Sequence, residues 1–394
     1  MKKVGIITLY YNNDNYGGIA QAYALNEYIS QLGFESELIS YKRSSPHIMG
    51  TKERITQDGL LVVVKEKLEN LPQKLYYRVI NKRAQSRYGE KLSKNIDDRK
   101  KAFSKSRETI PHSEEVTEDT IEDIIGDKYD YYISGSDQIW KPGVLQKPYL
   151  FTFLDDSKKR FSYASSIAIT DLPKDYGLIM KKGLCKYKWI SVREQSSKQY
   201  LESITGRDVD VVVDPTFLLS ERDWNKITGT RQVEGHYLFA YFLGDNCKQR
   251  RKVKEFAQQK KLKIVTLPHV EGKIRASDIG FGDIELYDVD LAKFFSLIKY
   301  ADYVCTDSFH AAVFANIFET NFSVFERFVF SKKSNMNSRI ETLLASLNEE
   351  DCFVEKYARK LLYHSIDFKR NKMKFKQQIE RSQELLKKVL EIEN

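Results

Sequence analysis

The chain has 394 residues, of which 41% are hydrophobic and 30% are charged, and its formal net charge is +9. Single hydrophobic cores stop growing at roughly 250 to 300 residues, so this length predicts two domains. No apolar stretch approaches the roughly 20 residues that cross a bilayer, and the apolar start breaks off at residues 12–15. We therefore expect neither a membrane span nor a signal peptide, and we expect a cytoplasmic protein.

The positive charge suits anionic partners, namely phosphorylated substrates, nucleic acid or an acidic lipid surface. Solubility alone is the alternative explanation. The four cysteines lie far apart, with no Cys-x-x-Cys pair and no histidine at ligand spacing. The sequence therefore predicts reduced thiols and no metal site.

The first half of the chain reads as alternating strands and helices. We expect a strand over residues 3–9, a polar loop over 11–18, a helix over 19–32 and a strand over 37–41. Residues 43–103 are rich in Lys and Arg and predict an inserted basic helical arm. Further strands are predicted over four segments that each end in polar or turn residues: 129–133, 160–164, 189–192 and 209–213.

A second α/β series follows residues 217–235, which we interpret as a linker. Its predicted strands are residues 236–243, residues 263–267, a segment ending at Asp307, and residues 322–325. Its predicted helices are residues 248–260, residues 291–299, a segment after His310, and residues 338–347, and a Gly-rich loop covers residues 271–282. The charged tail predicts a C-terminal helix that packs back. The predicted domains are residues 1–216, on the acceptor side, and 236–354, on the donor side, followed by the helix within 355–394. Two Rossmann-like domains that face a cleft form a GT-B-like α/β fold.

His310 is the first candidate for chemistry, because it lies between a strand-like run, residues 301–306, and a helix-like run, residues 311–318. Open α/β sheets place their chemistry at the carboxyl ends of strands. The unperturbed pKa of histidine, about 6.5, also suits proton transfer near neutral pH. A histidine satisfied within the core is the alternative.

Segment 12–18 joins the first strand to the first helix and ends in two glycines. Paired glycines let backbone N–H groups approach a ligand, and the dipole of the following helix favours negative charge. A tight turn without a ligand is the alternative. The residues predicted to line this loop or touch an acceptor are Asn15, Tyr16, Gly17, Gly18 and Gln21.

Asp137 follows an apolar strand and is predicted to accept a proton or bind a sugar hydroxyl, with Ser136 and Gln138 beside it. A helix N-cap is an equally good interpretation of this aspartate.

Two arginines are candidates for anion binding. Arg193 follows a strand, where its guanidinium can hold a carboxylate or phosphate through two parallel hydrogen bonds, or else pair with Glu194. Arg339 begins a helix, where an anion is also favoured, although a surface role is the alternative.

Six segments together resemble the polysaccharide pyruvyl transferase family, in the family's order and over roughly residues 3 to 347. They are Asn15-Tyr16-Gly17-Gly18 with residues 21–25, Gly135 to Trp140, Ser191 to Glu194, Asp214-Pro215-Thr216, Thr306 to His310, and Ser338-Arg339-Ile340.

This resemblance implies a cytoplasmic transferase of cell-envelope polysaccharide or exopolysaccharide synthesis with a GT-B-like fold. Members take pyruvate from phosphoenolpyruvate and install it as a ketal on two hydroxyls of a sugar, often on a polyprenyl-linked glycan. The resemblance assigns His310 to catalysis and Arg193 to donor binding. Phosphoenolpyruvate is then the donor substrate, no cofactor is needed, and a metal is not obligatory.

The chain also departs from the family pattern. Many relatives carry an arginine two residues before the histidine, where this chain has Ser308, and relatives of this branch usually carry glycine at the position of Ala311. If Ser308 touches the donor, another cation must supply the missing charge. The candidates are Arg275, Arg327, Lys332 and Arg339.

Two other functions remain open. One is a GT-B-like glycosyltransferase that uses a nucleotide sugar, and the other is a non-catalytic basic binding protein. We do not expect nucleic acid as a partner, because the basic residues of the arm lack aromatic stacking platforms. The arm is predicted instead to contact anionic membrane through Lys65, Lys67, Lys74, Arg78, Lys82 and Arg83.

Overall fold

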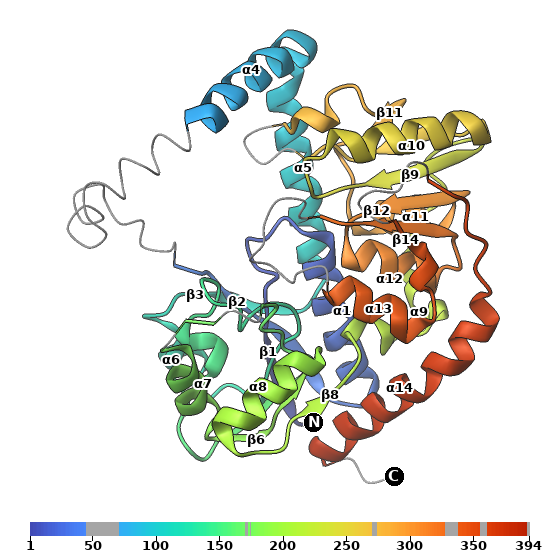
Figure 1. Ribbon diagram of the computed structural model, residues 1–394. Coiled ribbons are helices and arrows are strands. Elements are labelled where there is room, and N and C mark those ends of the chain that lie inside the picture. Colours follow the sequence, from blue (N-terminus) through green and yellow to red (C-terminus); the bar gives the residue numbers. More distant parts are fainter. Residues whose placement is uncertain are drawn as a thin grey trace.

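Two parallel six-stranded sheets form the framework of the protein (Figure 1). We obtained it as a computed structural model, which describes residues 1–44, 71–169, 172–173, 175–269, 274–327, 338–354 and 361–391. The strand orders are β3-β2-β1-β4-β5-β6 and β11-β10-β9-β12-β13-β14. Each order therefore runs outward in both directions from its first strand, which is the Rossmann arrangement. This repeated order defines two Rossmann-like domains.

The N-terminal sheet and its helices occupy the first half of the chain. A short parallel pair, β7 (Ser191–Val192) and β8 (Asp210–Val211), extends it. The strands are β1 (Lys3–Ile7), β2 (Glu35–Tyr41), β3 (His112–Val116), β4 (Tyr131–Ser134), β5 (Lys159–Ser162) and β6 (Tyr187–Trp189). The helices are α1 (Tyr16–Gln31), α4 (Leu71–Tyr88), α5 (Lys91–Glu108), α6 (Ile121–Ile125), α7 (Tyr176–Leu184) and α8 (Gln195–Thr205).

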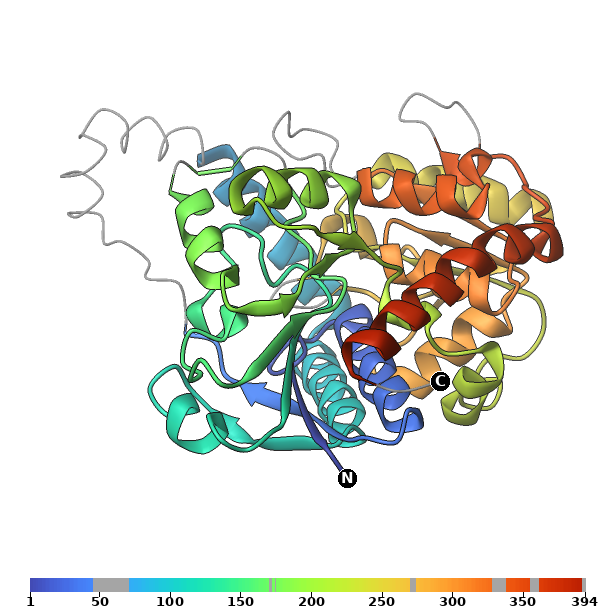
Figure 2. The ribbon, with the colours of Figure 1, turned by 90° about the horizontal axis from the view of Figure 1, so that it is seen from below.

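The second sheet lies beside the first, and the two halves can be distinguished in Figure 2. Its strands are β9 (Tyr237–Tyr241), β10 (Lys263–Thr266), β11 (Ile284–Glu285), β12 (Tyr303–Thr306), β13 (Phe322–Phe325) and β14 (Phe353–Val354). Its helices are α9 (Glu221–Ile227), α10 (Cys247–Lys260), α11 (Leu291–Lys299), α12 (Phe309–Ile317), α13 (Ser338–Leu347) and α14 (Phe368–Val389). No helix in the described ranges has both the length and the apolarity to cross a membrane.

Several elements differ from the sequence-based prediction. Helix α1 begins at Tyr16 rather than residue 19, so Gly17 and Gly18 belong to its first turn. The segment 217–235 contains helix α9, which starts with a capping box between Ser220 and Asp223. Strand β3 was missed because its polar sequence suits an exposed sheet edge, where it has no second neighbour. The predicted domain limits remain predictions.

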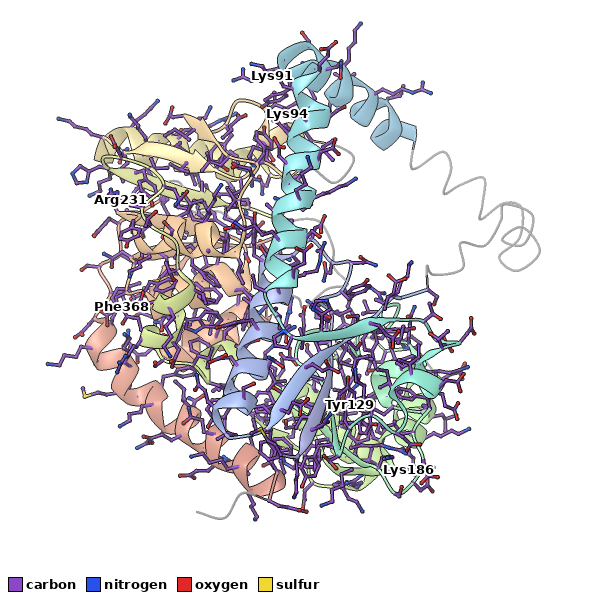
Figure 3. All side chains as sticks on the ribbon, turned by 180° about the vertical axis from the view of Figure 1, so that it is seen from behind. Lys91, Lys94, Tyr129, Lys186, Arg231 and Phe368 are labelled. Carbon is purple, nitrogen blue, oxygen red and sulfur yellow. The ribbon has the colours of Figure 1, made fainter. Side chains whose placement is uncertain are left out.

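The described part of the basic arm consists of α4 and α5. Figure 3 places Lys91 and Lys94 at the outer end of α5, where α4 also projects. The other end of α5 packs against the C-terminal half, because Lys105 pairs with Asp290 at 2.7 Å and the Ser106 hydroxyl accepts the Leu291 N–H. The arm prediction that falls on residues 45–70 lies outside the described residues.

An apolar seam joins the two halves around Tyr16. This ring, from α1, stacks on Phe294 of α11 with centroids 4.3 Å apart, and its hydroxyl donates to the Val289 carbonyl at 2.7 Å. Phe103 of α5 lies 4.5 Å from the same ring, and Tyr241 of β9 approaches it edge-on. A single buried apolar cluster therefore runs through both domains.

Helix α14 crosses from the C-terminal half to the N-terminal half (Figure 2). Near its start, Lys372 pairs with Glu319 beside α12. Farther along, the Ser382 hydroxyl accepts the Val213 N–H, and beyond its end Glu391 pairs with Lys159 of β5. The helix is thus fastened to both halves.

Candidate active site

The carboxyl ends of β4 and β12 bring the candidate residues together. In both sheets the strand order changes direction beside these strands, between β1 and β4 and between β9 and β12. Open α/β sheets bind ligands at such switch points. The segment 135–138 follows β4, and Asp307 to His310 follow β12.

Asp307 and Ser308 shape the turn that presents His310. The Asp307 carboxylate accepts the N–H groups of Leu243 and Gly244, each at 2.7 Å, and so ties the end of β9 to the end of β12. Ser308 caps α12 by accepting the Ala311 N–H. His310 consequently lies in the first turn of α12, one residue inside the helix rather than before it.

His310 is almost fully buried between α1 and the segment that follows β8. Its Nε2 lies 3.5 Å from Asp214 Oδ2, which is within ion-pair range, but it has no hydrogen-bond partner within the described part of the chain. On the α1 side, a Cβ at position 17 would lie 2.1 Å from His310 Nδ1. Gly17 therefore makes room for the imidazole.

The contacts of Gly17 and Gly18 correct the prediction that their backbone N–H groups approach a ligand. The N–H groups of Gly17 and Gly18 both point to Asn15 Oδ1, at 2.9 and 3.4 Å, because Asn15 caps the helix. They are committed to the protein rather than presented to an anion. Gly18 is also confined, since its Cβ would lie 2.7 Å from the Leu9 carbonyl oxygen.

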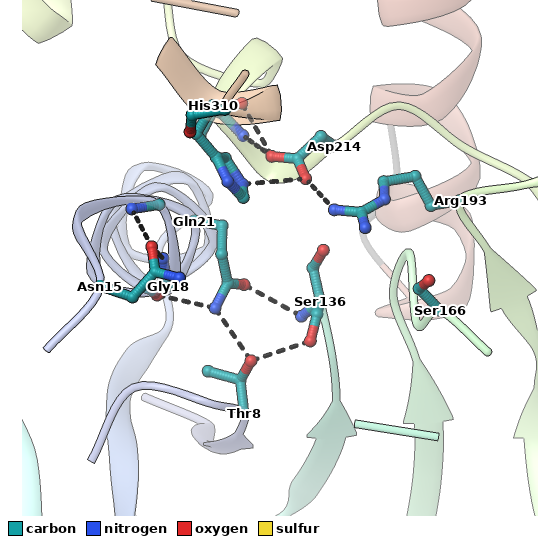
Figure 4. Close-up of polar contacts among 12 residues, drawn as sticks. Thr8, Asn15, Gly18, Gln21, Ser136, Ser166, Arg193, Asp214 and His310 are labelled. Carbon is teal, nitrogen blue, oxygen red and sulfur yellow. Dashed lines mark hydrogen bonds and ion pairs between the residues drawn. The ribbon is translucent and has the colours of Figure 1, made fainter. Parts of the chain in front are cut away.

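Asp214 links the histidine to an arginine (Figure 4). Its Oδ2 accepts from Arg193 Nη1 at 2.8 Å, and its Oδ1 accepts from the backbone N–H and hydroxyl of Thr216. Burial alone raises the pKa of this carboxyl, but the nearby His310 and Arg193 and the hydrogen bonds from Arg193 and Thr216 outweigh burial and hold the pKa below its usual range. Asp214 is thus a buried carboxylate held in its ionised form.

Arg193 is buried beside two carboxylates. Besides Asp214, its Nε lies 3.5 Å from Glu194 Oε1, and its guanidinium lies 4.7 Å from the centre of the Phe309 ring. Burial lowers the pKa of Arg193, but the neighbouring carboxylates outweigh this effect and raise it. Its Nη2 is buried and has no hydrogen-bond partner among the described residues. This nitrogen of the guanidinium can therefore donate to a ligand.

Arg339 lies close to Arg193, but its positive charge is less well offset by neighbouring groups. Its Nη1 and Nη2 reach the Gln138 side-chain oxygen at 2.7 and 2.8 Å, with the amide in the orientation that satisfies both partners. Its Nε is buried and unpartnered within the described ranges. Burial, followed by the charge of Arg193, lowers the pKa of Arg339 to about 10. A buried cation in this state favours an added anion.

The loop after β4 is held from behind by Gln21. The Gln21 side chain donates to Thr8 Oγ1 and to the Gly18 carbonyl and accepts the Ser136 N–H, so it supports the loop from within the protein (Figure 4). The Ser136 hydroxyl is buried and has no partner in the part of the chain that the structure describes. Asp137 is buried in a left-handed conformation, with φ of 65°.

The other sequence candidates fall outside this cluster or are otherwise committed. Tyr16 belongs to the apolar seam. Arg327 donates to the Asp307 carbonyl oxygen at 2.9 Å, and Arg275 occupies the N-cap position of a short helical turn at residues 276–278, outside the residues that line the site. Lys332 lies outside the described residues. Among the candidate cations that the structure describes, Arg339 lies with Arg193 in the lining of one cavity.

A cavity of about 350 Å³ opens beside this cluster. Its inner wall contains Arg193, Glu194, Asp214 and Arg339; His310 does not line it but lies behind Asp214, 3.5 Å from that carboxylate. The rest of the lining comes from residues 211–213, Phe217, helix α13 and helix α14. The cavity therefore lies at the junction of both halves and the C-terminal helix, a common setting for ligand sites.

Sequence analysis did not place Asp214 or α14 in the site. The polar Asp214-Pro215-Thr216 segment after a predicted strand was the available signal for Asp214, but its partner His310 is distant in the chain. Residues of α14 carried no such signal, because a charged amphipathic helix has the same sequence pattern whether it covers a core or a ligand.

Comparison with known proteins identifies the class of enzyme. A sequence model described as polysaccharide pyruvyl transferase matches residues 15–327, most of the chain. The protein therefore belongs to the polysaccharide pyruvyl transferase family and is a transferase. The search of the curated proteins gave no match.

Solved structures of low sequence identity share the architecture. A putative UDP-N-acetylglucosamine 2-epimerase from Listeria monocytogenes is 12% identical, with a TM-score of 0.52 over 100% of this chain and 97% of that one. MnaA from S. aureus, solved with UDP, is 13% identical, with a TM-score of 0.48 over 100% of this chain and 98% of that one. The first likeness, with the two parallel sheets described above, defines a GT-B-like fold.

Proposed function

We propose that this protein transfers a pyruvyl group from phosphoenolpyruvate to a sugar of a cell-surface polysaccharide, or of its lipid-linked precursor, and forms a ketal. The observation that carries the proposal is the pairing of two buried arginines, Arg193 and Arg339, beside the His310–Asp214 pair. Each arginine retains a buried N–H without a partner among the described residues. Two cations suit a small donor that carries a carboxylate and a phosphate.

The charge balance favours Arg339 as the group that replaces an arginine at position 308. Ser308 caps α12 and adds no positive charge. Arg339 is incompletely compensated, because burial and Arg193 lower its pKa to about 10. A bound phosphate or carboxylate would supply the missing negative charge. Arg193, anchored by Asp214, would orient the other anionic group.

In the proposed reaction, protonated His310 gives its proton to the methylene carbon of phosphoenolpyruvate while a sugar hydroxyl adds to the neighbouring carbon. That hydroxyl loses its proton, which restores the imidazolium. A second hydroxyl then bonds to the same carbon, the carbon–oxygen bond to phosphate breaks, and phosphate leaves with the electron pair and the second proton. Asp214, 3.5 Å from the ring, would stabilise the imidazolium.

The test is sugar-dependent release of phosphate from phosphoenolpyruvate, followed by phosphorus NMR with candidate lipid-linked sugars. We expect His310→Ala to lower the rate by about 10² to 10⁴-fold, the usual contribution of a general acid or base. The matched control is His236→Ala, at an exposed histidine before β9. Unchanged turnover in His310→Ala would remove the assigned role.

A nucleotide-sugar glycosyltransferase is the second candidate, favoured only by the GT-B-like fold. Ligand binding to the folded state raises the unfolding temperature. We expect phosphoenolpyruvate to stabilise the protein and Arg339→Ala to abolish that shift. Stabilisation by a nucleotide diphosphate sugar, with none by phosphoenolpyruvate, would favour the second candidate instead.

We further propose that the enzyme works in the cytoplasm, at the inner face of the membrane. The motivating observation is the arm, where exposed Leu75 and Val79 lie among the basic residues of α4. Such a surface suits anionic lipid. Co-sedimentation that shows no preference for vesicles with anionic lipid would contradict this location.

A further inference from the structure

The cavity changes character from its inner end to its outer wall. At the inner end, the side chains of Arg193 and Asp214 are 5% and 1% exposed. The outer wall is formed by exposed polar residues of α14, namely Gln378 and Arg381, the latter with 69% of its side chain exposed. The two inner arginines are therefore shielded from water, whereas the outer wall presents the neutral amide of Gln378 beside the exposed Arg381, which pairs with Asp210 at 3.6 Å.

The outer wall combines polar side chains with aromatic rings. Thr342 and Ser346 of α13 line it together with Gln378 of α14, and Phe217 and Phe375 lie edge-to-face with centroids 4.7 Å apart. The Gln378 amide makes no hydrogen bond with any described residue. An amide can both donate and accept, as a sugar hydroxyl does, and aromatic rings suit the apolar faces of a sugar.

The family match ends at residue 327, before α13 and α14 begin. Arg193, Asp214 and Phe217 lie inside the matched segment, whereas the cavity residues of α13 and α14, which include Arg339, lie beyond it. The site is thus built from a part shared with the family and a part outside the family match.

We propose that α13 and α14 form the acceptor subsite, and that Gln378 and Arg381 select the sugar unit that receives the transferred group. This inference rests on the proposed function for the name of the reaction, but the binding of a neutral, hydroxyl-bearing sugar can be tested alone. The loop at residues 15–21 is less suited to this role, because Asn15 and Gln21 are committed to hydrogen bonds within the protein.

Binding to an array of immobilised bacterial glycans tests the inference without pyruvyl transfer. We expect the parent protein to bind a subset of glycans and Gln378→Ala to lose about tenfold in affinity for them, as expected when a hydrogen bond to a substrate hydroxyl is removed. Gln377→Ala is the matched control, because the adjacent glutamine is exposed and does not line the cavity. Both variants should unfold at the parent temperature.

Kinetics supply the second readout. With an acceptor found on the array, Gln378→Ala and Arg381→Ala should raise the KM for the sugar about tenfold while the KM for phosphoenolpyruvate stays within about twofold. Equal glycan binding by Gln378→Ala and Gln377→Ala, or no glycan binding by the parent, would overturn the inference. Glycan binding that depends on Gln378 without phosphate release would overturn the proposed function and leave the acceptor subsite standing.

Discussion

The two halves meet in two regions with opposite properties. In the apolar seam, Tyr16 stacks on Phe294 and its hydroxyl is satisfied by a carbonyl oxygen. In the charged region, Arg193, Arg339 and His310 are also buried but keep nitrogen atoms without hydrogen-bond partners in the described ranges. Buried polar groups normally find partners, and exceptions mark strain or function. The seam therefore provides stability, and the charged region provides a place for a ligand.

The largest expected effect comes from breaking the seam. Phe294→Ala removes a ring that contacts Tyr16, Phe239 and Tyr241. We expect a loss of about 3–5 kcal/mol in the free energy of unfolding, measured by urea titration, because the cavity cannot collapse fully. Leu178→Ala, at a 72% exposed side chain, is the control. A variant of unchanged stability would mean that the seam is not a main source of cohesion.

The next effect comes from the carboxylate of the charged region. Asp214→Asn leaves the buried Arg193 short of a counter-charge, and we expect a loss of about 3 kcal/mol near neutral pH. The pKa of Asp214 lies below its usual range in the folded protein. Its stabilisation is therefore fully present above the unfolded pKa of about 3.9 and is lost as the pH falls below that value.

Urea midpoints of parent and Asp214→Asn protein, measured from neutral pH down to about pH 3, check this dependence. The difference in urea midpoint between the parent and Asp214→Asn should decrease only at the acidic end of this pH range. Asp156→Asn, at an exposed carboxylate, should show no such gap. A gap that stays constant into acid would contradict the ion-pair explanation.

A smaller effect tests the space beside His310. Gly17→Ala places a Cβ about 2.1 Å from His310 Nδ1, so the imidazole must move. A displacement of this kind is expected to lower the rate of phosphate release by about 10- to 100-fold. Gly177→Ala is the matched control, because Gly177 is also the second residue of a helix and its new Cβ would meet the Tyr200 hydroxyl at 3.1 Å and the Ile204 Cγ2 at 3.7 Å. Equal activities would show that the ring tolerates displacement.

The smallest expected effect concerns a second buried carboxylate, Glu349, whose pKa is shifted in the opposite direction to that of Asp214. No cation among the described residues offsets Glu349, and burial raises its pKa from 4.5 to about 7. The folded state then binds this proton more tightly than the unfolded state, so the stability of the parent falls as the pH rises from about 4.5 to 7. Glu349→Gln should be more stable than the parent by about 1 kcal/mol at pH 8 and equal to it near pH 4.5. The unfolding temperatures of the parent and Glu349→Gln, measured across this pH range, check the prediction. A difference between the two proteins that does not change with pH would contradict it and would mean that the Glu349 carboxylate is fully hydrated.

The sequence predicted the parallel sheets and the position of His310 because both depend on local patterns. An apolar strand followed by polar residues and then a helix places His310 at a strand end, whatever surrounds it. The family motifs also pointed to Arg193 and Arg339. The structure adds the contacts among them, and these depend on how loops that are distant in the chain meet.

The remaining site residues could not be assigned from local patterns. Gly17 was predicted to lie beside a ligand, but the sequence could not reveal that its neighbour is the imidazole of His310. Gln21 was expected to touch an acceptor, whereas its amide supports the loop at Ser136. The role of α14 depends on its path across the two halves, which amphipathic periodicity does not determine.

The path of α14 has a mechanical consequence. Because the helix is tied to Glu319 through Lys372 and to β5 through Glu391, a hinge rotation of one Rossmann-like domain against the other must either break one attachment or carry the helix along. Substrate entry and product release would then be timed by movement of this single helix. Amide hydrogen exchange along residues 368–389 would report how often it lifts.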